Sequence, residues 1–454
     1  MRRIAATALV AACIAAGWSV PAASSAKAGP VLRSGHGLKV LAATQIDARE
    51  INARFQTAAT GDPVNARILL PVGYAANPRR RYPTLYLYAG TGEHASDWTN
   101  HGDIEGLTEK LPLIVVMPDV GLGIGDGWFS NWRDTRTSLG PNQWETFQIN
   151  QLIPWVDDNF RTVADRSGRA VAGLSQGGFG ATIAATRHPD LFISVGSFSG
   201  AVDIAYGKLL KPVFQSFPIG TTLADFVPPF AVFGDPIQHQ VNWKGHCPTT
   251  LVRNLRGMDV HLYTGNGLPG PYDDPTTVAL ASIEVLAHAE THTMYDHAVD
   301  LHIPIKLTDY GAGTHTFPYW IRDMRTYLPE IMRQFARHAT RPAHVQYDAT
   351  ASGWKQWGWS VAVRRPVAEQ FTYLRHAGAN GFVLRGHGLA RVTTPSFYRE
   401  DSSITALVGS DGHAKQLTLR PDGSGRIALT VALPAKVKLS AHRAVAPSAV
   451  RAPG

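Results

Sequence analysis

Cysteine is nearly absent from this 454-residue chain, which has two such residues, Cys13 and Cys247. Cys13 lies in an N-terminal stretch that we expect to be removed, so Cys247 would remain alone. A protein with a single cysteine has no internal disulfide bond. The composition therefore excludes a small disulfide-stapled fold, and stability must come from the packing of a hydrophobic core.

Charged residues are also few, at 17% of the chain, and they do not gather in long runs of one sign. The formal net charge of +8 includes Arg2, Arg3 and Lys27, so loss of an N-terminal segment holding these three leaves +5. A basic run at residues 79–81 is typical of a solvated loop before a strand. Binding of nucleic acid needs clustered basic residues, so we expect no nucleic-acid partner.

Long apolar stretches are limited to the N-terminus. A basic start is followed by an apolar stretch at residues 4–20 and then by small residues up to Ala28. This order is typical of a secretory signal peptide, here residues 1–28, cut after Ala28. A lipoprotein cleavage site at Cys13 is an open alternative that fits less well, because the apolar stretch continues beyond it. No second stretch is long enough to span a membrane, so we expect a secreted protein without a stable membrane span.

The remaining chain is long enough for two domains, and its first part alternates between strand and helix patterns. Apolar residues at helical spacing predict helices over residues 144–160 and 319–338, whereas residues 29–60 are expected to be irregular. Strands separated by helices are typical of a mostly parallel α/β sheet, which we expect within residues 29–340. The expected strands lie at residues 64–72, 85–88, 113–117, 169–174, 192–198, 260–263 and 305–307.

The pattern changes near residue 341, where helical spacing becomes rare and alternation replaces it. Alternating apolar and polar residues predict strands at residues 381–394, 415–419 and 426–433. A Pro-Asp-Gly-Ser-Gly turn signal joins the last two. We therefore expect a β-rich accessory domain over residues 341–440 and a disordered tail, rich in alanine and proline, over residues 441–454.

A G-x-S-x-G motif at residues 173–177 has Ser175 at its centre. The motif alone is a weak signal, so the neighbouring residues must decide whether Ser175 is a nucleophile. A short apolar run comes before it, and small apolar residues that favour a helix follow at residues 178–187. Strand, sharp turn and helix form the setting of a nucleophile elbow, in which the serine hydroxyl is exposed. The sequence therefore predicts Ser175 as a catalytic nucleophile.

A serine hydroxyl needs a base, which an acid must orient, and with a nucleophile elbow the chain order is serine, acid, histidine. His315 follows the last expected strand in a loop made flexible by Gly311 and Gly313, just before the final helix. We expect His315 to be the base. Position alone does not choose the acid among Asp273, Asp274, Glu284, Glu290, Asp296 and Asp309.

An oxyanion hole needs two backbone N–H groups. The first belongs to Gln176, the residue after the predicted nucleophile. The second should come from the loop after residues 85–88, where Gly90 and Gly92 let the backbone approach closely and flank Thr91. Thr91 and Gln176 are therefore the expected oxyanion-hole residues.

His288 and His292 are spaced so that both could bind one metal ion on a helix. No third ligand can be placed from the sequence, and such a pair is then more typical of a solvated helix face. We expect no metal ion and no cofactor.

Several motifs occur in an order that resembles the secreted mycolyltransferases of the antigen 85 type and their broader esterase relatives. They are "LPLIVVMPDVGLGIGDGWFSNW", "WETF", "AVAGLSQGGFGATIAATRHPDLFISVGSFSGAVD", "VHLYTGNGLPG" and "GTHTFPYW". The resemblance covers roughly residues 50–335 and implies an α/β-hydrolase fold, with the small C-terminal β domain outside it. It also implies acyl transfer or ester hydrolysis through a serine acyl-enzyme.

In this resemblance, Ser175 matches the nucleophile of the family and His315 matches the base. Gln176 and Thr91 match the oxyanion-hole positions. The acid of the family is a glutamate on a helix about 30 residues before the histidine, as the chain order requires. Glu284 matches that position, so the resemblance implies Glu284 rather than Glu290 or Asp309 as the acid.

One departure from the family concerns the acceptor. An aspartate and an arginine that grip trehalose in the family are replaced here by Ala89 and Gly92. We therefore expect a secreted serine esterase that acts on acyl esters. The alternatives are an acyltransferase of the mycolyltransferase type with a non-trehalose acceptor, and a non-catalytic wall- or carbohydrate-binding protein. The C-terminal domain is expected to contact the cell wall or another polymer.

Overall fold

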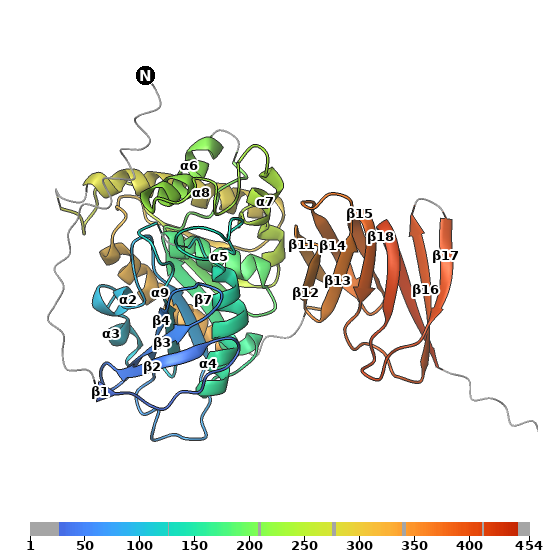
Figure 1. The fold of residues 1–454 in the computed structure, drawn as a ribbon, viewed down its shortest axis with the longest axis horizontal. Coiled ribbons are helices and arrows are strands. Elements are labelled where there is room, and N and C mark those ends of the chain that lie inside the picture. Colours follow the sequence, from blue (N-terminus) through green and yellow to red (C-terminus); the bar gives the residue numbers. More distant parts are fainter. Residues whose placement is uncertain are drawn as a thin grey trace, which may run out of the picture. The chain divides into compact units, whose positions relative to one another are not determined.

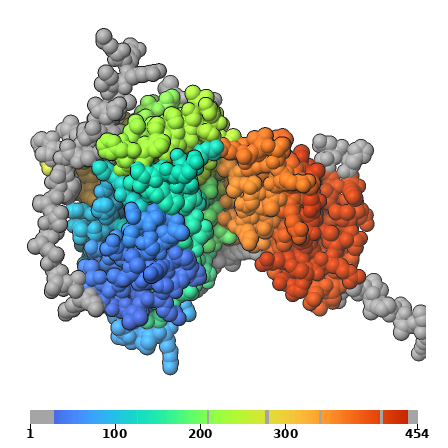
Figure 2. All heavy atoms as spheres, viewed as in Figure 1, coloured from blue at the N-terminus to red at the C-terminus, as the bar shows by residue number. Residues whose placement is uncertain are grey.

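The computed structural model describes residues 27–125, 127–207, 210–274, 278–337, 342–410 and 413–443. The chain divides into two compact units, residues 1–340 and 341–454, shown as a ribbon in Figure 1 and as spheres in Figure 2. The expected signal peptide lies outside the described residues, except for Lys27 and Ala28. Each unit is built on its own β-sheet.

The first unit is built on a mixed sheet of ten described strands, in the order β1-β2-β3-β4-β6-β5-β7-β8-β9-β10. Neighbours from β1 to β4 and on to β6 are antiparallel, and all later neighbours are parallel. The strands are β1 (Lys27–Ala28), β2 (Lys39–Gln45), β3 (Glu50–Gln56), β4 (Val64–Leu69), β5 (Thr84–Tyr88), β6 (Ile114–Pro118), β7 (Arg169–Leu174), β8 (Ser194–Phe198), β9 (Asp259–Thr264) and β10 (Lys306–Asp309).

Helices pack against this sheet (Figure 1). Helix α5 follows β7 directly and contacts β5, β7 and β8, whereas α9 contacts β7, β8 and β9. The predicted helix at residues 144–160 is present as a π-helical segment, Thr146–Leu152, followed by α4. The α-helices described are α2 (Asp97–Asn100), α3 (Ile104–Thr108), α4 (Ile153–Asn159), α5 (Gln176–Arg187), α6 (Lys211–Ala224), α7 (Gln240–Gly245), α8 (Val278–Asp300) and α9 (Phe317–Ala336).

The expectation of an irregular segment at residues 29–60 is wrong, because β2 and β3 form there and extend the antiparallel edge of the sheet. Strand β2 has no apolar alternation to reveal it, since its residues are exposed or half-buried. In β3, by contrast, Ile51, Ala53 and Phe55 are buried at alternate positions. Apolar residues at these alternate positions are a sequence pattern from which this strand could have been predicted.

The central strands β5, β6, β7 and β8 are buried along their entire lengths. Parallel sheets with helices on both faces bury both faces, so their strands read as continuous apolar runs rather than as alternating patterns. The carboxyl ends of parallel strands lie at one edge of the sheet, where ligands bind in open α/β folds. The loops that follow β5, β7, β8, β9 and β10 therefore gather at this edge.

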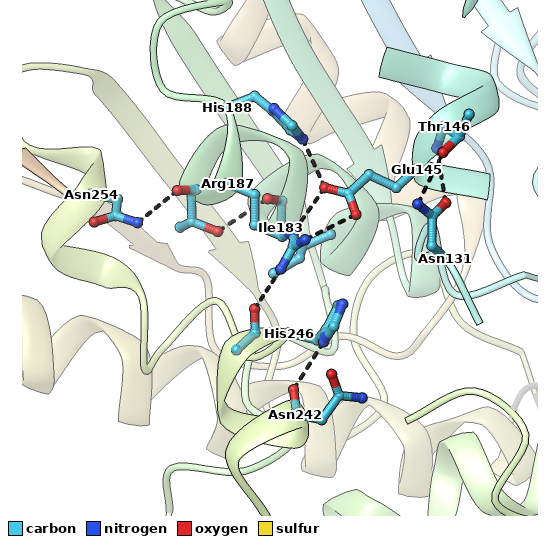
Figure 3. A network of polar contacts seen from close by, with 11 residues as sticks. Asn131, Glu145, Thr146, Ile183, Arg187, His188, Asn242, His246 and Asn254 are labelled. Carbon is cyan, nitrogen blue, oxygen red and sulfur yellow. Dashed lines mark hydrogen bonds and ion pairs between the residues drawn. The ribbon is translucent and has the colours of Figure 1, made fainter. Parts of the chain in front are cut away.

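A buried ion-pair network fixes the end of helix α5 (Figure 3). Both carboxylate oxygens of Glu145 accept hydrogen bonds from Arg187, at 2.8 and 3.1 Å, and one lies 2.8 Å from Nε2 of His188. Burial alone would raise the pKa of Glu145, but Arg187 and His188 hold that pKa well below its ordinary value. The Nδ2 group of Asn254 donates to the Thr186 carbonyl at 2.9 Å. These contacts anchor the helix that begins immediately after Ser175.

The second unit is an antiparallel sheet in which the main strand order is β11-β14-β15-β18-β16-β17, with β13 also paired to β15 and to β12. Its core includes Trp359 and Phe382, whose rings meet edge to face at 5.4 Å. The strands are β11 (Val345–Ala349), β12 (Gly353–Gln356), β13 (Trp359–Arg364), β14 (Thr372–Gly378), β15 (Gly381–Thr393), β16 (Ser402–Ser410), β17 (His413–Leu419) and β18 (Ala428–Arg443).

The expected start of the C-terminal tail at residue 441 is wrong, because β18 continues to Arg443. Ala441, His442 and Arg443 pair with β16, and backbone pairing of this kind needs no apolar side chain. The rest of the expected tail lies outside the described residues. Among the described residues, no helix is both long enough and apolar enough to cross a membrane.

Candidate active site

Ser175 lies at the carboxyl end of β7, between β5 and β8, on the turn into α5. Its backbone has φ 51° and ψ −123°, a region that residues with a Cβ rarely adopt. The Ser175 N–H donates to the Phe198 carbonyl at 2.9 Å, which holds the turn against β8. The residue is half-buried, in contrast to the buried residues on either side of it. The structure therefore has the strained strand-to-helix turn of a nucleophile elbow.

The glycines beside Ser175 are required by close packing of backbone. A Cβ atom on Gly177 would lie 2.4 Å from the Ala89 carbonyl oxygen. A Cβ atom on Gly173 would lie 2.3 Å from the Gly177 carbonyl oxygen. Neither obstacle is a flexible side chain, so any larger residue would force the backbone of the turn to move.

His315 and Glu284 form a buried pair. The Nδ1 atom of His315 is 2.7 Å from Oε2 of Glu284. Glu284 is fully buried on α8, and His315 is 8% exposed in the loop between β10 and α9. The Trp320 ring meets the imidazole edge to face, with ring centroids 5.0 Å apart. The imidazole is thus held by the carboxylate at one nitrogen and by an aromatic ring at its side.

The second carboxylate oxygen of Glu284, Oε1, accepts three hydrogen bonds. The donors are the Ser199 hydroxyl at 2.9 Å, the Thr264 hydroxyl at 3.1 Å and the Gly265 N–H at 2.7 Å. Ser199 comes directly after β8, and the other two donors lie at the end of β9. Because Oε1 is fully engaged, Oε2 is fixed toward His315. No sequence pattern marks these donors beyond their place at the ends of two predicted strands.

The other acidic residues weighed from the sequence have different contacts. Glu290 accepts the Asp203 N–H at 3.0 Å, and burial raises the pKa of Glu290 well above its ordinary value. Asp273 accepts the Tyr319 hydroxyl at 2.6 Å. Asp309 accepts the Gly311 N–H at 3.0 Å. Within the described residues, Glu284 is the acid that has a hydrogen bond to His315.

The remaining ring nitrogen of His315, Nε2, is buried and has no hydrogen-bond partner among the described residues. No hydrogen bond therefore joins it to Ser175 in this structure. Such bonds are often long in enzymes without substrate and tighten only when substrate is bound. A buried ring nitrogen without a partner carries a cost that a reacting hydroxyl would relieve.

Thr91 and Gln176 are joined through their side chains. The amide nitrogen of Gln176 donates to the Thr91 hydroxyl at 2.9 Å and to the Gly125 carbonyl at 3.1 Å. Its amide oxygen accepts the Trp128 N–H at 3.1 Å. Gln176 is also the first residue of α5, where backbone N–H groups have no partner within the helix and favour negative charge. The loop carrying Thr91 is thus tied to the start of this helix.

Glu93 lies near Ser175, and no role for it was predicted from the sequence. Its Oε2 accepts the Gly90 N–H at 2.6 Å. Burial raises the pKa of Glu93 to about 8, although the Gly90 bond opposes this shift. A Cβ atom on Gly90 would lie 3.1 Å from the Ser175 Cβ and 3.4 Å from Oε2 of Glu93. A carboxyl group that is partly protonated near neutral pH therefore lies beside the nucleophile elbow.

The fold and the geometry of this site are those of the α/β-hydrolase class. The match to a family of known sequences agrees with this class. Residues 57–331 match the family model described as "Putative esterase", and the chain belongs to this esterase family.

The curated relatives include a protein named as an esterase and proteins named as acyltransferases. Esterase Rv1288 of Mycobacterium tuberculosis is 36% identical over 238 residues, which are 52% of this chain and 50% of the relative. The "Diacylglycerol acyltransferase/mycolyltransferase Ag85B" of Mycobacterium leprae is 28% identical over 55% of this chain and 75% of its own. The chain thus spans about half the length of the esterase it matches. Antigen 85-like proteins and esterases are both among its relatives, as the sequence motifs predicted.

Solved structures support the fold. The crystal structure of MPT51 from Mycobacterium tuberculosis matches 62% of this chain and 96% of its own, with a TM-score of 0.50 and 21% identity. An S-formylglutathione hydrolase from Agrobacterium tumefaciens matches 65% of this chain and 99% of its own, with a TM-score of 0.50 and 14% identity. The predicted α/β-hydrolase fold with a small C-terminal β domain is confirmed.

Proposed function

We propose that this chain is a secreted serine esterase in which Ser175, His315 and Glu284 act as a catalytic triad through an acyl-enzyme. The observation that carries the proposal is the fixed His315–Glu284 pair, at 2.7 Å, with Nε2 of His315 left without a partner in the described part of the chain. A histidine oriented through Nδ1 keeps Nε2 free to accept a proton.

Acylation follows from this arrangement. Nε2 of His315 accepts the hydroxyl proton of Ser175 while Oγ attacks the ester carbonyl carbon. Glu284 stabilises the imidazolium that forms. The backbone N–H groups of Gln176 and Thr91 stabilise the oxyanion. The tetrahedral intermediate collapses, the alcohol leaves with the proton from His315, and the acyl group stays on Ser175.

Deacylation repeats these steps with another nucleophile, and we propose that water is this nucleophile. His315 takes a proton from water while the water oxygen attacks the acyl carbonyl carbon; the tetrahedral intermediate then collapses, the free acid leaves, and His315 returns the proton to Oγ of Ser175. A transferase must bind its acceptor well enough to compete with water, which needs oriented polar groups. Ala89, which stands at one family position for gripping trehalose, is 2% exposed and apolar. Transfer to a non-trehalose acceptor remains the second possibility, supported by the acyltransferase names among the relatives.

The products formed from an acyl donor distinguish hydrolysis from transfer to trehalose. The purified chain is incubated with p-nitrophenyl esters of several acyl lengths, with and without trehalose, and the products are separated by mass. Free acid should dominate in both cases. Acyl-trehalose formed in preference to free acid would contradict the proposal. A fluorophosphonate probe that fails to label Ser175 in an active preparation would refute the nucleophile assignment.

The second unit has a separate proposed role. Ser175, Glu284 and His315 all precede residue 341, so chemistry does not require residues from this unit. We propose that it attaches the enzyme to a cell-wall or similar polymer. Phe371, directly before β14, and Tyr373, on β14, stack with their ring centroids 5.6 Å apart, and Tyr373 is 36% exposed. Sedimentation with insoluble cell wall, compared between the full chain and Tyr373→Ala, tests this role, and equal sedimentation would count against these aromatics.

A further inference from the structure

Two histidines and an aspartate meet at one place outside the proposed triad. His288 and His292 lie one turn apart on α8, and Asp309 is the last residue of β10. Nε2 of His292 is 3.0 Å from Oδ2 of Asp309, and Nδ1 of His288 is 3.9 Å from the same oxygen. One ligand atom from each residue lies within 4.8 Å of the other two. The third residue, which could not be placed from the sequence, is thus supplied by the end of strand β10.

These distances fit the first coordination shell of a small cation. Two ligand atoms at about 2.0–2.1 Å from a tetrahedral zinc ion are about 3.3 Å apart. The distances of 3.0 and 3.9 Å to the Asp309 oxygen lie on either side of this value. Small rotations of the side chains would therefore bring the three atoms around one ion.

The hydrogen bonds of the three residues also leave room for an ion. Asp309 uses Oδ1 to accept the Gly311 N–H at 3.0 Å and directs Oδ2 toward the histidines. Nδ1 of His288 is buried and has no hydrogen-bond partner in the described chain. A metal ion would satisfy this nitrogen. The three side chains are 29–36% exposed, so an ion can enter from solvent.

We propose that His288, His292 and Asp309 bind a divalent transition-metal ion, with zinc as the best-fitting ion. Two imidazoles with one carboxylate suit zinc and its neighbours, whereas calcium and magnesium prefer oxygen ligands alone. Three protein ligands leave a position for water or a further ligand. This proposal goes beyond the ester chemistry and does not depend on it.

The ion would connect two elements that carry the proposed triad. His288 is one turn after Glu284 on α8, and Asp309 begins the loop that leads to His315. Binding would fix the end of β10 to the helix and thereby hold the loop beside Glu284. The three ligands have no hydrogen bond to Ser175 or His315 among the described residues, so they position these elements and do not take part in the reaction.

Direct metal binding tests the site. The full chain, purified without a histidine tag and stripped with a chelator, is titrated with Co²⁺, and its visible d–d absorption is recorded. One Co²⁺ should bind per chain, and Zn²⁺ should displace it. Replacement of outer-shell residues weakens metal sites about 10–100-fold, so replacing a ligand, as in His292→Ala or His288→Gln, should weaken binding at least about tenfold. Saturating Zn²⁺ should raise the Tm of the parent chain but not that of His292→Ala.

A matched control lies on the same helix. His297 bonds to the Tyr206 hydroxyl at 2.8 Å and is not part of the cluster, so His297→Gln should bind Co²⁺ like the parent chain. Asp309→Asn tests the third ligand in the same way. If this variant fails to fold, the two histidine variants still show whether the site binds metal. The proposal is refuted if the parent chain shows neither absorption nor a Tm shift, or if His292→Ala and His288→Gln bind as tightly as the parent.

Discussion

Replacing Glu284 by glutamine should inactivate the enzyme by changing the tautomer of His315. The amide that is introduced has one acceptor oxygen and one donor nitrogen. Three donors, from Ser199, Thr264 and Gly265, point at the present Oε1 position. The two hydroxyls can turn to accept an amide N–H, and that of Thr264 also has the Gly265 carbonyl as an acceptor at 2.9 Å, but the Gly265 N–H would lose its acceptor, at about 1–3 kcal/mol. The amide oxygen must therefore take this position, and the amide nitrogen must face His315.

The consequence for His315 follows directly. Its Nδ1 atom would have to accept the amide N–H, so Nε2 would carry the ring proton and could not take one from Ser175. The corresponding acid-to-amide change in serine proteases lowers kcat about 10⁴-fold. We expect a similar loss here, which corresponds to about 5.5 kcal/mol of transition-state stabilisation at about 1.36 kcal/mol per tenfold change.

The assay compares kcat/KM for a p-nitrophenyl ester between Glu284→Gln and Glu290→Gln, with circular dichroism and Tm as checks of folding. Glu290 is the matched control, because it is a buried glutamate on the same helix whose carboxylate accepts the Asp203 N–H and has no hydrogen bond to His315 among the described residues. Its amide variant should keep activity within a few-fold. A loss below about tenfold for Glu284→Gln, or an equal loss for Glu290→Gln, would refute the reasoning.

Three further predictions concern other parts of the chain. Ser175→Ala should lower turnover at least about 10³-fold with an unchanged circular dichroism spectrum; near-parental turnover would remove Ser175 from the mechanism. The folded-state pKa of Glu93, about 8, lies above its ordinary value of 4.5. The protonated carboxyl therefore stabilises the folded state fully below about pH 4.5, and this contribution is lost as pH rises toward 8. The Tm of Glu93→Gln relative to that of the parent chain should therefore increase from about pH 5 to about pH 8, and a constant difference would contradict the raised pKa. A chain ending at Thr340 should still cleave a small soluble ester, because the proposed triad precedes that point; a folded truncation without activity would mean that the second unit shapes the site.

The sequence was most informative where a local pattern coincides with a structural element. Strand β7 has the bounds that were predicted, Arg169–Leu174, because a buried strand reads as a short apolar run, which here follows Arg169. The turn at Ser175 could likewise be predicted from the glycines around it. Strand β2 was missed because its exposed side chains show no apolar alternation.

Contacts between distant segments were beyond the reach of local patterns. Position could not choose Glu284 among six acids, and the choice rested on the family resemblance. Ser199 and Gly265 meet Glu284 because β8 and β9 are neighbours, which requires knowledge of the strand order. Asp309 joins His288 and His292 for a similar reason, since β10 packs near α8 in space but follows it in sequence.

The anchoring of Glu284 has a consequence for which parts of the chain can change in evolution. The three donors lie immediately after β8 and at the end of β9, whereas the long segment between these strands, residues 199–258, contributes only its first residue among those that the structure describes. This segment contains α6 and α7 and carries exposed apolar side chains such as Phe226 and Ile237. Beyond Ser199, its described residues can therefore change without removing a hydrogen bond to Glu284, so the position of this carboxylate is set by the ends of two strands and not by the segment between them.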